Sequence, residues 1–196
     1  MGMNRKYSGF TLVEMLIVMG IIIILMAVGI AAGRFAINRA NDVAHQNAVD
    51  QLFVAAQSYL TDTREYPGLT SVNFEAAFKS DCTESATQPC LNDYLSEGEF
   101  KGGTDATFYY WTSSDRGSAL VCVSKGGFED ASDRGYYCTG NGFTHEEQPG
   151  ASITEKEIDP IDGAGDTTPG GTSGWQVQLR WTNQVAAGAS HWGNPS

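Results

Sequence analysis

The chain has 196 residues, and its 23 Asp and Glu outnumber its 12 Lys and Arg to give a net charge of −11 at pH 7. Every acidic residue except Glu14 lies at or beyond Asp42, so the acidity belongs to the later part of the chain. This balance argues against nonspecific binding to nucleic-acid phosphates, which depends on clustered cations. Acidity of this kind is also typical of a merely solvated surface.

The first predicted element is a membrane-spanning helix over residues 10–33. The apolar run from Phe10 to Gly33 holds a single charge, Glu14, and follows the basic residues Arg5 and Lys6. About 24 helical residues cross the roughly 30 Å hydrocarbon core of a bilayer. A carboxylate inside such a span costs at least about 2.5 kcal/mol, so Glu14 needs a cationic partner. Lys6, at the membrane edge, is one candidate within the chain.

The residues around Glu14 resemble a known processing site. Lys6-Tyr-Ser-Gly9 followed by Phe10-Thr-Leu-Val-Glu14 resembles the leader junction of type IV pilins and the related pseudopilins. The resemblance implies that prepilin peptidase removes residues 1–9, cutting between Gly9 and Phe10, and methylates the new amino group of Phe10. It also implies that Glu14 forms an assembly salt bridge with the Phe10 ammonium of a neighbouring subunit.

An ordinary secretory signal has a different order of parts. Its apolar region spans about 7–15 residues and its cleavage site comes afterwards. Here the suitable cut comes before the apolar run, so the run is expected to stay in the mature protein. An uncleaved signal anchor is the alternative interpretation.

The helix is predicted to continue over residues 34–62 as an amphipathic segment. Small and apolar residues recur there at spacings of three and four: Ile37, Ala40, Ala44, Ala48, Leu52, Ala55 and Tyr59. A free-standing coiled coil is a weaker interpretation, because the pattern lacks a clean heptad. Gly29 and Gly33 have the spacing that lets membrane helices approach closely. The polar stretch Thr61–Gly68 predicts the helix end.

Residues 63–196 are predicted to form a globular head. Short helical stretches are expected at Asn73–Phe78 and around Leu91–Leu95, and strands at Thr107–Thr112, Ala119–Ser124, Tyr136–Cys138 and Trp175–Trp181. We expect an α+β fold in which the long N-terminal helix packs on one face of a small antiparallel sheet. Residues 144–174 contain few large apolar side chains, which predicts an acidic surface loop.

The four cysteines, Cys82, Cys90, Cys122 and Cys138, all follow the predicted membrane segment. None forms a Cys-x-x-Cys pair, so a zinc site is not expected, and an oxidising compartment favours disulfides. Three pairings are possible. We choose the local ones, Cys82–Cys90 and Cys122–Cys138, of which the second would link adjacent strands.

No cofactor and no metal are expected. Residues Asp159–Asp166 suggest a calcium loop only weakly, because the first and third ligand positions fall on Ile158 and Pro160. The three histidines, His45, His145 and His191, lie far apart in the sequence, and no motif of a hydrolase or a phosphate-binding loop occurs. We therefore do not expect an enzyme.

The resemblance implies a structural subunit of a type IV pilus. Before assembly, such a subunit resides in the cytoplasmic membrane of a bacterium, in contact with lipid. An inner-membrane assembly platform and its ATPase then polymerise it with copies of itself into a helical surface fibre, or fimbrium, for cell adhesion and twitching motility. A pseudopilin of a type II secretion or competence system is the second candidate, and a membrane-anchored extracellular binding protein is the alternative of another class.

Overall fold

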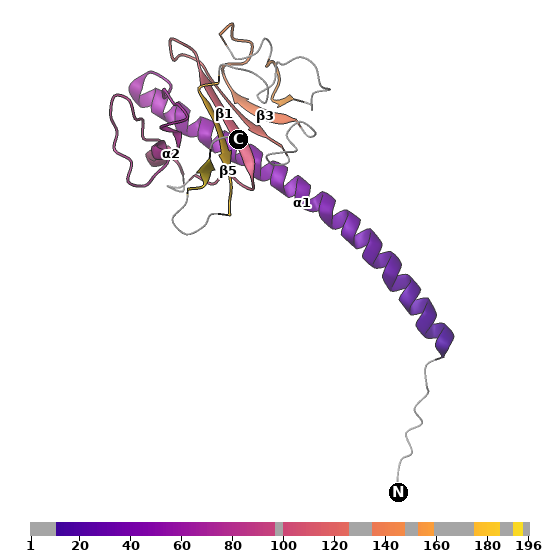
Figure 1. Ribbon diagram of the computed structural model, residues 1–196. Helices are drawn as coiled ribbons and strands as arrows, with labels where there is room; N and C mark the ends of the chain where they lie inside the picture. Colours follow the sequence, from indigo (N-terminus) through magenta and orange to yellow (C-terminus); the bar gives the residue numbers. More distant parts are fainter. Residues whose placement is uncertain are drawn as a thin grey trace. The chain divides into compact units, whose positions relative to one another are not determined.

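The computed structural model describes residues 11–96, 100–125, 135–147, 153–158, 175–184 and 190–193. The chain divides into two compact units, residues 1–40 and 41–196, and helix α1 (Leu12–Thr63) contributes to both. Figure 1 shows α1 in indigo and magenta and the strands that follow it in pink, orange and yellow.

The described part of the first unit is the N-terminal part of α1. All side chains from Thr11 to Ala40 are exposed, including long apolar ones such as Leu12, Ile23 and Leu25. Among the described residues, α1 is the one helix long and apolar enough to cross a membrane by length and composition. The predicted apolar span is therefore helical from Leu12 to its end at Gly33.

The second unit contains the C-terminal part of α1, which has one buried face. His45, Ala48, Val49, Leu52, Ala55 and Ala56 are its buried residues, so the expected stripe holds from Ala48 onward. Ile37 and Ala40 belong to the same predicted stripe but are exposed. The reason is that the compact second unit begins at Asn41, beyond both residues.

The described residues of the second unit also form one antiparallel sheet of six strands. Its strands are β1 (Ala106–Thr112), β2 (Ala119–Ser124), β3 (Tyr136–Gly140), β4 (Glu157–Ile158), β5 (Val177–Trp181) and β6 (Trp192–Gly193). They lie in the order β4-β3-β2-β1-β5-β6. The structure thus has the predicted α+β, pilin-like arrangement of a long helix and an antiparallel sheet. The short helix α2 (Phe74–Ala77) and a 3₁₀ turn (Asn92–Tyr94) occupy the two expected helical stretches.

Both faces of the central strands are covered by other parts of the chain, whereas the sequence predicted packing of the long helix on one face. Phe108 and Tyr110 share a core with Leu52 of α1, while Tyr109 and Trp111 belong to a second cluster with Ile153. Successive strand residues point to opposite faces, so these two clusters lie on opposite sides of the sheet. Every residue of β1 and β2 is consequently buried.

Part of the predicted acidic loop over residues 144–174 takes part in this second cluster. Ile153 is only 1 % exposed, and β4 pairs with β3 through Tyr136 and Ile158. Ile153 and β4 are therefore tied to the sheet, whereas most other described residues of this segment, such as Glu146 and Glu155, are exposed. Residues 148–152 and 159–174 lie outside the described residues, and the weak calcium motif at Asp159–Asp166 lies among them.

The end of α1 is attached to the turn between β1 and β2. The helix ends at Thr63, within the predicted stop, and the Tyr66 amide donates to the carbonyl of Arg116 at 2.9 Å. The hydroxyl of Tyr110, on β1, donates to the carbonyl of Pro67 at 2.8 Å and is fully buried. These bonds fix the chain that leaves the helix against the sheet.

Candidate functional site

The first turn of α1 is closed by a reciprocal pair of contacts between Thr11 and Glu14. The Glu14 amide donates to Thr11 Oγ1 at 3.3 Å, and the Thr11 amide donates to Glu14 Oε2 at 2.8 Å. The Thr11 hydroxyl adds a second bond to Oε2, also at 2.8 Å. This arrangement is a capping box, in which the side chains at the first and fourth positions satisfy helix amides that have no partner within the helix.

The capping box gives Glu14 a local role that the sequence analysis missed. The signal was present, because Thr11-x-x-Glu14 before an apolar run is the sequence pattern of a capping box. Both bonds from Thr11 end on Oε2, and among the described residues Oε1 accepts none. A carboxylate can accept on both oxygens, so the cap leaves Glu14 able to receive a cation.

The apolar surface that follows Glu14 is open along its whole described length. Among the described residues, a Cβ placed on Gly20, Gly29 or Gly33 would meet no atom within 4 Å apart from those of the adjacent residues and the nearby helix backbone, so no packing contact there requires a glycine. Each costs a helix interior about 1 kcal/mol relative to alanine. Glycines four apart, such as Gly29 and Gly33, let another helix approach closely.

The remaining residues of the predicted processing site are Arg5, Lys6, Gly9 and Phe10. All four lie outside the described residues, which begin at Thr11. The cleavage point, the methylated residue and the leader cations therefore stay predictions. Glu14 is the predicted assembly residue that the structure describes.

The structure contains both disulfides chosen in the sequence analysis. Cys82 pairs with Cys90, with Cα atoms 5.7 Å apart, and Cys122 pairs with Cys138, with Cα atoms 4.0 Å apart. The second pair joins directly opposed residues of β2 and β3. Such cross-links typically stabilise a domain by about 2–4 kcal/mol.

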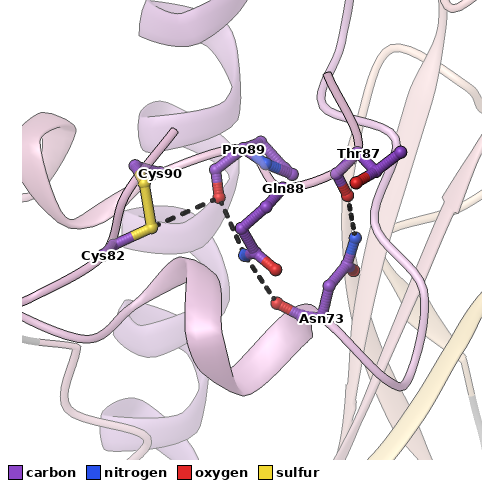
Figure 2. Close-up of a disulfide and its surroundings, with 6 residues drawn as sticks. All are labelled: Asn73, Cys82, Thr87, Gln88, Pro89 and Cys90. Carbon is purple, nitrogen blue, oxygen red and sulfur yellow. Dashed lines mark hydrogen bonds between the residues drawn. A yellow bond between two sulfur atoms is a disulfide. The ribbon is translucent and has the colours of Figure 1, made fainter. Parts of the chain in front are cut away.

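The loop closed by Cys82 and Cys90 is held by Asn73, which lies just before α2 (Figure 2). Asn73 Nδ2 donates to the carbonyl of Thr87 at 2.8 Å, and Gln88 Nε2 donates to the carbonyl of Asn73 at 3.1 Å. These two hydrogen bonds connect the loop to the residue that precedes α2. Sequence reasoning gave no signal for them, because Asn73 and Gln88 are brought together only by the fold.

Each of the three histidines has a different set of contacts. Nε2 of buried His45 contacts the hydroxyl of Thr104 at 2.9 Å and the carbonyl of Thr104 at 3.2 Å. His145 Nδ1 accepts from the Glu147 amide at 3.2 Å. His191 stacks on Trp181 with ring centroids 4.7 Å apart. Each ring thus has a separate structural contact.

Glu147, which follows β3 in the chain, holds the turn between β1 and β2 through two hydrogen bonds to Ser114. Its two carboxylate oxygens accept from the Ser114 amide at 2.7 Å and from the Ser114 hydroxyl at 2.8 Å. The backbone hydrogen bond from Ser114, followed by the hydroxyl bond, lowers the pKa of Glu147 below its ordinary value. Hydrogen bonds to the charged form of a carboxyl group favour that form.

One comparison with known proteins finds a match. A family model described as the prokaryotic N-terminal methylation motif matches residues 4–30, which include the predicted cleavage point, Glu14 and much of the apolar run. No curated protein sequence and no solved structure matches the chain.

Proposed function

We propose that this chain, whose N-terminal methylation motif supports its assignment to the type IV pilin and pseudopilin superfamily, is the structural subunit of a type IV pilus. The motif carries the proposal, because it joins a processing site to an apolar helix. The motif and the helix also indicate a bacterial protein anchored in a membrane. Leader removal by prepilin peptidase and polymerisation into pilus-like fibres follow from the motif in general terms.

The proposed maturation step creates a cationic partner for the Glu14 carboxylate. A cut after Gly9 frees the amino group of Phe10, four residues before Glu14, and the capping box keeps the carboxylate at this end of the helix. An unpaired carboxylate or ammonium in hydrocarbon each costs at least about 2.5 kcal/mol. A second subunit lowers both costs when its Phe10 ammonium meets Glu14, because opposite charges attract strongly in a poorly screening medium.

The exposed apolar side chains of α1 suit both lipid and a fibre core. Moving such a helix from lipid into a bundle of copies gains little hydrophobic free energy, because lipid tails are themselves apolar. Close packing at small residues such as Gly29 and Gly33 and pairing of charges must therefore drive assembly. The N-terminal unit contains the residues that this proposal uses, Gly29 and Gly33 for close packing and Glu14 for the charge pair.

The head suits exposure outside the cytoplasm. Disulfides persist in oxidising compartments, and both pairs of this chain lie in the second unit. The head also contains the excess of acidic residues, which keeps a protein surface soluble. In this proposal the acidic surface faces water, and no nucleic-acid partner is expected.

The test combines mass spectrometry and electron microscopy of bacteria that make the chain. The purified chain should lack residues 1–9 and carry a methyl group on Phe10. Antibodies against the head should label long surface filaments, and both results should disappear in a strain without prepilin peptidase. Short or absent filaments would instead favour a pseudopilin, and uncut, unassembled chains would favour a membrane-anchored binding protein.

A further inference from the structure

A hollow of about 240 Å³ opens in the second unit beside α2 and the β5–β6 edge of the sheet. Two phenylalanine and two tryptophan rings line it: Phe78, Phe100, Trp181 and Trp192. None of these residues has a part in the proposed assembly of the chain. The hollow is therefore a separate feature of the head.

The rings are held by one another, so the hollow is formed before any ligand arrives. Phe100 stacks on Trp192 with ring centroids 5.5 Å apart and meets Trp181 edge-on at 5.3 Å. Phe78 packs on Phe100 at 5.1 Å. Trp192 is partly buried, whereas Phe78, Phe100 and Trp181 are buried, so Trp192 is the ring that a ligand reaches most readily.

The rim of the hollow offers hydrogen-bond donors and acceptors with balanced charge. Glu75 and Lys79 both line it and form an ion pair of 3.0 Å. His191, also in the lining, contacts the carbonyl of Thr182 through Nδ1 at 2.8 Å. A carbonyl only accepts, so Nδ1 carries the hydrogen and the neutral ring keeps Nε2 as an acceptor.

These features select a class of ligand. A cation would meet Lys79 and an anion would meet Glu75, so the ion pair favours a neutral ligand. Aromatic rings favour a flat apolar face, and the rim favours hydroxyl groups that both donate and accept. A pyranose ring combines a C–H face with an edge of hydroxyl groups.

We propose that this hollow, which we call the aromatic pocket, binds one neutral pyranose unit of a surface glycan. Trp192 packs on the sugar, Glu75 and His191 accept from its hydroxyls, and Lys79 donates to them. The inference goes beyond the proposed function, because it gives the head a ligand whether or not the chain polymerises. Its failure would leave the assembly of the fibre unaffected.

The test uses the full-length chain in micelles of a zwitterionic detergent, because sugar-headed detergents would compete. The probes are the methyl pyranosides of glucose, galactose, mannose and N-acetylglucosamine, with choline as a charged probe. Saturation-transfer NMR and tryptophan fluorescence report binding. We expect saturable binding of at least one pyranoside in the millimolar range, as is usual for so small a ligand, with transfer to its ring C–H protons.

Glu75→Gln separates the aromatic pocket from general effects. The variant keeps the size of the side chain but removes its charge, so we expect the dissociation constant to rise about tenfold or more. Asp93→Asn, on the exposed residue Asp93 that lines a different hollow, is the matched control and should bind like the wild type. Circular dichroism and intact mass should show that both variants are folded with their disulfides.

Three results would overturn the proposal. One is the absence of saturable binding by every pyranoside up to about 50 mM, far above the expected range. Another is equal affinity of the Glu75→Gln variant and the wild type. The third is tighter binding of choline than of any pyranoside, which would assign the aromatic pocket to a cation.

Discussion

Glu14 has two separable properties, a hydrogen-bonding role in the capping box and a negative charge, and two substitutions test them individually. Glu14→Gln keeps an oxygen that can accept from the Thr11 amide and hydroxyl but removes the charge. Thr11→Val removes the hydroxyl and the two contacts that use it, while the amide bond to Glu14 and the charge remain. We expect Glu14→Gln to block assembly and Thr11→Val to permit it.

The magnitudes of the two effects differ enough to be distinguished. Loss of a capping side chain costs about 0.5–2 kcal/mol of helix stability, and this cost falls on the monomer and the fibre alike. Glu14→Gln instead leaves the Phe10 ammonium unpaired in an apolar surrounding, at a cost of at least about 2.5 kcal/mol. Since about 1.4 kcal/mol is a factor of ten, each subunit contact should weaken roughly fifty-fold or more.

The assay measures sheared surface fibres by immunoblot, normalised to the processed chain in the membrane. Mass spectrometry checks that both variants lose residues 1–9 at the wild-type rate, so that a processing defect is not mistaken for an assembly defect. A wild-type fibre yield from Glu14→Gln would refute the charge-pair reasoning. An equal loss of fibres from Thr11→Val would show that the cap, rather than the charge, is what assembly needs.

Three further predictions concern processing, the core and acid. Gly9→Ala should be cut less well and accumulate uncut chain, detected by intact mass, if the peptidase excludes the added methyl group before the proposed cut; normal processing would contradict this account. Leu52→Ala, at a fully buried position, should lower the free energy of unfolding by about 2–5 kcal/mol in thermal denaturation, whereas Val54→Ala, at a position that is 54 % exposed, should cost far less. Because the pKa of Glu147 is lowered, its bonds to Ser114 are complete above the ordinary carboxyl value of 4.5 and are lost as pH falls through the lowered pKa. The protection of the Ser114 amide, measured as its hydrogen-exchange rate relative to the intrinsic rate at the same pH, should therefore fall on acidification in the wild type but change less in Glu147→Gln.

Much of the fold follows from local patterns in the sequence. The apolar run and the spacing of Ala48, Leu52 and Ala55 indicate α1, and dense β-branched and aromatic residues indicate β1 and β2. Strands β4 and β6 have two residues each, and such short segments form only because a neighbouring strand is already in place. Their pairing depends on the fold rather than on any local preference.

The capping box and the aromatic pocket also differ in how far the sequence predicts them. The capping box of Thr11 and Glu14 is a contact between residues three apart, so its pattern can be read directly from the sequence. Phe100 and Trp192 of the aromatic pocket are distant in the chain, and no periodicity relates them. Single-sequence reasoning can name such aromatic residues but cannot tell a shared hollow from separate parts of a core.

The capping box also explains how the proposed membrane segment can tolerate the Glu14 carboxylate before a neighbouring subunit pairs with it. Two donors from Thr11 lower the cost of the carboxylate, although neither neutralises its charge. Any pairing with Lys6 would end at the proposed cut, because Lys6 is removed with the leader, and the same cut frees the Phe10 ammonium. Cleavage would therefore remove Lys6, a cation that cannot enter the fibre, and create the Phe10 ammonium, which can. The capping box is formed wholly by residues after the cut, so it is present both before and after cleavage.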